Sequence, residues 1–83
     1  MQSFSKTFFV PAQGTLNFLF TRIYTIKGML YFVTVLDYRG RLYPFYMERK
    51  DGAWWVVATD ALPSWVKEVE RELSTAILSA VQQ

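Results

Sequence analysis

Four turn-forming segments, each containing a glycine, divide the first 58 residues into short runs that favour β-strands. These segments begin at Pro11, Lys27, Arg39 and Asp51. Glycine permits the positive φ angles that tight turns require, and Asp-Gly is a strong signal for a two-residue hairpin. The runs between the turns are rich in aromatic residues, Val and Thr. This spacing predicts strands at about residues 4–10, 15–26, 29–38, 41–50 and 53–58.

After residue 62 the hydrophobic period changes from two to about 3.6, which indicates an amphipathic helix. Pro63 suits the first helical turn, where its missing N–H matters least. We expect one helix at about residues 63–81. Short hairpin connections place consecutive strands side by side. The predicted fold is therefore α+β, an antiparallel β-meander of four to five strands followed by one C-terminal amphipathic helix packed on one sheet face, within a single domain.

The composition excludes several kinds of active site. The chain of 83 residues contains no His and no Cys, so it has no imidazole for acid–base chemistry and no thiolate for nucleophilic attack or zinc binding. The carboxylates of Asp37 and Glu48 are expected roughly 20 Å apart, whereas two-carboxylate mechanisms need about 5 to 9.5 Å. We therefore expect a protein that is not an enzyme and that uses no cofactor or metal.

No stretch of about 18 uninterrupted apolar residues occurs, and the first residues do not resemble a secretory leader. We accordingly expect a cytoplasmic protein that makes no membrane contact.

Two-residue hairpin loops would sort the strand residues into two faces. One face is the expected seat of the helix and carries Leu19, Ile23, Leu30, Phe32, Leu36, Phe45, Met47, Trp54 and Val56. The other is expected to be uncovered and carries Phe18, Phe20, Arg22, Tyr24, Tyr31, Val33, Val35, Tyr46, Glu48, Lys50 and Trp55. A three-residue bulged loop at Arg39-Gly40 would exchange the faces of all later residues, and this alternative stays open.

An uncovered apolar face predicts an interaction surface, because contiguous apolar patches above a few hundred Å² usually bind something. A chain this short buries only about 60 to 65% of its unfolded surface, so association with a partner would add needed burial. We expect a homo-oligomer, with a dimer favoured, or a protein-interaction module. The predicted interface residues are Phe18, Phe20, Val33, Val35, Leu78 and Val81.

An alternative is binding of single-stranded nucleic acid. Residues 1–50 contain seven basic and two acidic side chains, and bases can stack on aromatic rings beside such charges. The predicted nucleic-acid residues are Arg22, Tyr24, Lys27, Tyr31, Tyr46, Lys50 and Trp55. The element order also resembles, in topology only, the single-stranded-DNA-binding fold of the transcriptional-coactivator and Whirly type. A shallow aromatic pocket for a small apolar or sugar ligand is a third alternative.

Overall fold

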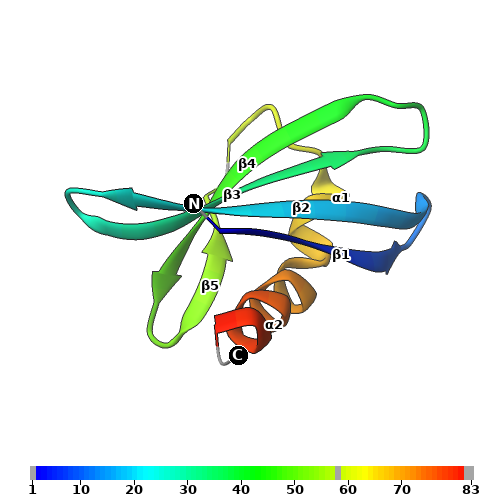
Figure 1. The fold of residues 1–83 in the computed structure, drawn as a ribbon. Helices are drawn as coiled ribbons and strands as arrows, with labels where there is room; N and C mark the ends of the chain where they lie inside the picture. Colours follow the sequence, from blue (N-terminus) through cyan, green and yellow to red (C-terminus); the bar gives the residue numbers. More distant parts are fainter. Residues whose placement is uncertain (1, 58, 82–83) are drawn as a thin grey trace.

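A computed structural model describes residues 2–57 and 59–81. Its five strands form one antiparallel sheet in the order β1-β2-β3-β4-β5, and two helical segments follow (Figure 1). The bounds are β1 Ser3–Val10, β2 Gly14–Thr25, β3 Gly28–Leu36, β4 Leu42–Lys50, β5 Ala53–Val56, α1 Ser64–Glu68 and α2 Glu70–Val81. The predicted α+β meander is confirmed.

The loop between β4 and β5 has the predicted two-residue form. Asp51 and Gly52 have φ angles of 55° and 80°, and Lys50 pairs with Ala53. Positive φ at both central residues defines the type I′ turn, whose twist matches that of the flanking strands. Local sequence chemistry alone therefore sets the register of β4 against β5.

The loop between β3 and β4 has three residues, so the expected two-residue loop is wrong and the bulged alternative is correct. The Asp37 N–H donates to the Arg41 carbonyl at 2.9 Å, which leaves Tyr38, Arg39 and Gly40 outside the ladder. The Asp37 carboxylate accepts hydrogen bonds from the N–H groups of Arg39 and Arg41, both at 2.9 Å, and Gly40 has φ of 83°. This side chain and this glycine stabilise the longer loop.

The extra loop residue decides which side chains share a face. Val33 lies opposite Phe45 and Tyr31 lies opposite Met47, so these four residues lie on the same side of the sheet. A two-residue loop would have placed Tyr46 opposite Val33. The predicted faces are therefore wrong for β2 and β3 and right for β4 and β5, because a shift of one residue reverses the side on which a strand presents its side chains.

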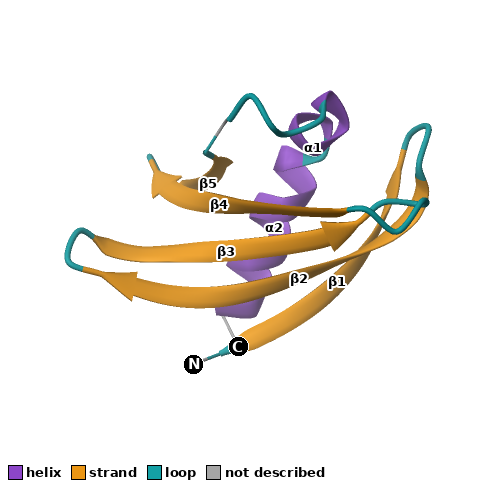
Figure 2. Ribbon diagram, turned by 90° about the horizontal axis from the view of Figure 1, so that it is seen from above, coloured by secondary structure: helices purple, strands orange, loops and turns teal. Residues whose placement is uncertain are grey.

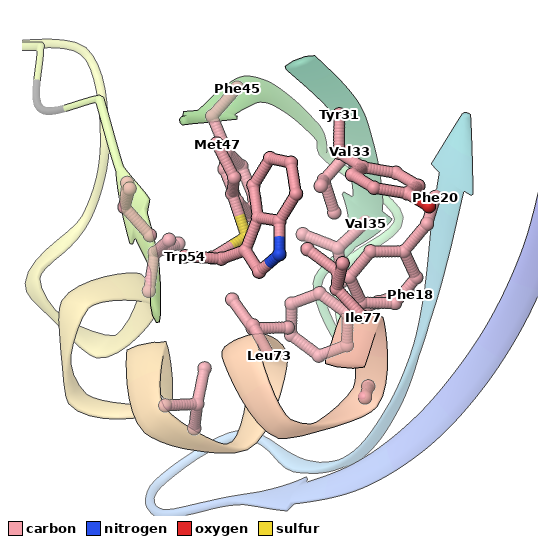
Figure 3. Close-up of a cluster of buried hydrophobic side chains, with 14 of the residues drawn as sticks. Phe18, Phe20, Tyr31, Val33, Val35, Phe45, Met47, Trp54, Leu73 and Ile77 are labelled. Atoms are coloured by element: carbon pink, nitrogen blue, oxygen red, sulfur yellow. The ribbon is translucent and has the colours of Figure 1, made fainter. Parts of the chain in front are cut away.

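The core lies between this side of the sheet and α2, where aromatic and aliphatic side chains converge (Figure 3). The sheet contributes Val10, Leu16, Phe18, Phe20, Tyr31, Val33, Val35, Phe45, Met47, Trp54 and Val56. The helical segments contribute Val66, Val69, Leu73, Ala76 and Ile77. Tyr31 and Trp54 pack edge to face with ring centroids 5.1 Å apart, a favourable geometry for two aromatic rings.

The predicted single helix is interrupted at Val69, which has φ of −103° and ψ of 14°. Pro63 precedes the first helical residue as the N-cap. The segment after the break begins with Glu70, whose carboxylate accepts a hydrogen bond from the Val56 N–H at 2.7 Å. Val66 and Val69 are both buried, so the interruption is compatible with core contacts on either side of it. The last strand is predicted to run to residue 58, but β5 ends at Val56 in the structure. Residue 58 lies outside the described part of the chain.

Candidate assembly surface

The side of the sheet opposite α2, here called the outer face, is covered by no described helix or strand (Figure 2). Its large apolar side chains come from all five strands. They are Phe9, Leu19, Ile23, Leu30, Phe32, Leu36, Leu42, Tyr46 and Trp55. Leu36 and Leu42 are 53% and 55% exposed, and Leu19, Tyr46 and Trp55 are exposed to 44%, 46% and 44%.

The strand register brings these side chains into adjoining rows. Leu36 lies opposite Leu42. Phe32 lies opposite Tyr46, with ring centroids 5.1 Å apart. The Trp55 indole N–H donates to the Lys50 carbonyl at 2.9 Å, which orients its ring on the surface. The apolar side chains therefore form a contiguous patch rather than scattered single contacts.

The outer face carries little charge. Among its described residues only Glu48 and Lys50 are charged, and their signs are opposite. Toward β1 the face carries no charged side chain. It includes Phe9, which lies opposite Thr15 and is 71% exposed, beside side-chain hydrogen bonds from Thr7 to Asn17 at 3.2 Å and between Ser3 and Thr21 at 3.3 Å. Such a surface suits an apolar partner, whereas a phosphate backbone requires several neutralising cations.

The structure places four of the predicted interface residues in the core. Phe18, Phe20 and Val33 are fully buried and Val35 is 2% exposed, so the prediction that they lie on an uncovered face is wrong. The physical reason is the bulged loop, which brings these side chains to the side that α2 covers. Leu78 is partly buried against the core, and the side chain of Val81 lies outside the described residues.

The predicted nucleic-acid residues do not gather on one surface. Tyr46, Lys50 and Trp55 lie on the outer face, and Lys27 lies in the β2–β3 loop. The other three residues belong to the helix side of the sheet, namely Arg22, Tyr24 and Tyr31.

Arg22 is engaged by two tyrosines of its own sheet. It donates hydrogen bonds to the hydroxyls of Tyr24 and Tyr31, both at 3.3 Å. These bonds raise the pKa of Arg22 above its ordinary value, because they stabilise the charged guanidinium. Tyr31 is only 1% exposed, so its ring is not accessible for base stacking. A single basic aromatic face, as the sequence suggested, is not formed.

The sequence signal that identifies the outer face lies next to the helix. Trp54 and Val56 lie on β5, the last strand before the helical segments, and both side chains are buried in the core that α2 covers. Working back from them through a three-residue loop gives the correct assignment for β3 and β2.

The described residues contain no group of three or more His, Cys, Asp or Glu side chains that could hold a metal ion. None of the helices in the described ranges is long and apolar enough to cross a membrane. Comparison with protein-family models, curated proteins and solved structures gives no match for this chain.

Proposed function

We propose that this protein is a non-enzymatic assembly module whose outer face packs against the outer face of a second copy. The observation that carries this proposal is the contiguous patch of exposed Leu, Tyr and Trp side chains on an uncovered sheet. Exposed apolar patches of this kind are the usual mark of protein–protein contact. A second sheet packed at about 10 Å would convert the one-sided sheet into a sandwich.

The outer face has a suitable size for such a contact. Strands about 4.8 Å apart, rising about 3.3 Å per residue, give this five-stranded sheet a projected area on the order of 600 Å². The accessible area is larger because side chains project from that plane. Stable interfaces bury about 800 Å² on each partner, so one face of the sheet is close to what a dimer requires.

The charges of the face favour association of identical copies. Glu48 and Lys50 lie two residues apart on the same side of β4. A two-fold contact makes the same surface meet itself, so Glu48 of one copy can lie opposite Lys50 of the other. Both charges then have a partner, and the remaining contact is apolar.

The test is light scattering coupled to size-exclusion chromatography. The double variant Leu19→Glu, Leu42→Glu should weaken association by at least about 100-fold, because it places two charges in an apolar contact. Its far-UV circular dichroism should stay unchanged, since both side chains are exposed in the protomer. The control Thr15→Glu, an exposed polar position on the same face of β2, should keep the native mass.

A monomeric native chain at high concentration contradicts the proposal. So does a double variant that retains the native mass. A salt-sensitive increase in mass with a fluorescent single-stranded oligonucleotide, abolished by Lys50→Glu, would instead support nucleic-acid binding.

A further inference from the structure

The two edges of the sheet differ. At the β5 edge, the N–H of Trp54 donates to the Ser74 hydroxyl at 3.0 Å, and the N–H of Val56 donates to the Glu70 carboxylate at 2.7 Å. Both donors point away from β4, because the ladder uses the alternate residues, as in the bond from the Val57 N–H to the Tyr46 carbonyl. Side chains of α2, which runs beside β5 in Figure 1, therefore close this edge to an additional strand.

The β1 edge is open. The Arg22 N–H donates to the Gln2 carbonyl at 2.9 Å, which fixes the phase of the ladder between β1 and β2. Even-numbered residues of β1 bond to β2, so the odd-numbered residues turn their N–H and C=O groups away from the sheet. These residues are Ser3, Ser5, Thr7 and Phe9. No described strand lies beyond them.

This edge also lacks the features that normally prevent strand pairing, which are proline, bulges, several charges or a covering element. The eight residues Ser3–Val10 pair with β2 without a bulge and contain no proline. Lys6 is their only charged residue, and Phe9 is 71% exposed. A long, regular and nearly uncharged edge is a template for another strand.

We propose that β1 pairs antiparallel with β1 of a second copy, which joins two five-stranded sheets into one continuous sheet. The difference between the two edges indicates which strand of a second copy pairs with β1. Pairing of β1 with β5 of another copy would build an open chain, but Ser74 and Glu70 already occupy the donors of β5. Pairing of β1 with itself is isologous and closes after two copies.

The most favourable register centres the two-fold axis on Thr7. An axis at Lys6 would place two like charges directly opposite each other, which is destabilising. An axis at Ser5 would pair only residues 3–7 within the strand, whereas an axis at Thr7 pairs residues 4–10. The Thr7 register also places Lys6 opposite Phe8, so the aliphatic stem of the lysine covers an apolar ring.

This edge contact uses a different surface from the outer face and does not rest on the proposed function. If both contacts form, four copies assemble into a closed tetramer in which the two contacts have perpendicular two-fold axes. Loss of the outer-face contact then leaves an edge-paired dimer, and loss of the edge contact leaves a face-packed dimer. The two proposals can therefore fail separately in one set of mass measurements.

Thr7→Pro is the decisive variant, because the Thr7 N–H makes no bond within the protomer and its loss leaves the internal ladder intact. We expect edge association to weaken at least about 100-fold. At the two-fold axis the Thr7 N–H of each copy donates to the other copy, so the variant removes two central hydrogen bonds. Thr7→Val is the matched control, because it also loses the hydrogen bond to Asn17 but keeps the N–H. It should associate like the native chain.

Cross-linking provides a second readout. The native chain contains no Cys, so an introduced Cys can form a disulfide only with the same residue of a second copy. Paired Cα atoms at the axis are about 5.5 Å apart, within the range that a disulfide spans. Thr7→Cys should therefore oxidise to a covalent dimer, even when Leu19→Glu and Leu42→Glu are also present. Thr15→Cys, on β2, is the control and should not cross-link through the edge.

Equal masses for Thr7→Pro and Thr7→Val would overturn the proposal. It would also be overturned if Thr7→Cys did not form the dimer, or if the edge bound only a peptide of different sequence and never a second copy.

Discussion

The hydroxyl of Ser74 accepts a hydrogen bond from the backbone N–H of Trp54 across 3.0 Å, which joins the middle of α2 to the last strand of the sheet. Both groups are buried, so loss of the hydroxyl leaves the Trp54 N–H without its hydrogen-bond partner in the protomer. Ser74→Ala should therefore lower the free energy of unfolding by about 1 to 3 kcal/mol, measured by urea denaturation. Ser79→Ala, an exposed serine on the same helix, should change it by less than about 0.5 kcal/mol. Equal effects would show that the Ser74 bond contributes nothing.

Removal of both groups that close the β5 edge should change how the protein assembles. In Ser74→Ala, Glu70→Ala the outward N–H groups of Trp54 and Val56 lose their partners, so β1 of another copy can pair there. Open chains that grow with concentration are expected, and light scattering would detect them.

Addition of Thr7→Pro to that double variant should suppress this growth, because it blocks the other edge. Aggregates that persist after this addition would instead indicate non-specific association of a destabilised chain.

Adjacent residues on β2 should respond differently, because they lie on opposite sides of the sheet. Phe18 is fully buried and packs edge to face on Phe8 with centroids 5.5 Å apart, whereas Leu19 is 44% exposed. Phe18→Ala should lower the free energy of unfolding by about 3 to 5 kcal/mol and Leu19→Ala by less than about 1 kcal/mol. Monomer unfolding at low protein concentration is the measurement. A larger loss of stability in Leu19→Ala than in Phe18→Ala would show that the core lies on the other side of the sheet.

The loop glycine that sets the β3–β4 register should be sensitive to substitution. Gly40 has φ of 83°, and a Cβ added there would meet nothing within 4 Å, so any cost comes from backbone conformation alone. Gly40→Ala should cost about 1 to 2 kcal/mol, measured by thermal or urea unfolding. Arg39→Ala in the same loop should stay within about 0.5 kcal/mol. A neutral Gly40→Ala would contradict the role assigned to this glycine.

The sequence alone determined the positions of the strands, their order and the presence of a C-terminal helical region. These properties depend on local chemistry: glycine and Asp-Gly at the turns, β-branched and aromatic residues between them, and a change of period after residue 62. Composition also excluded imidazole and thiolate chemistry, which needs residues that the chain does not contain.

The tertiary structure decided which side of the sheet is covered and which edge is open. Both sides of β2 and β3 carry large apolar residues, Phe18 and Val33 on one side and Leu19 and Phe32 on the other, so hydrophobicity could not select the buried side. One additional residue in the loop ending at Gly40 made that selection, because strand side chains alternate with a period of two. The closure of the β5 edge depends on Glu70 and Ser74, which approach that strand only after the helix has packed against the sheet.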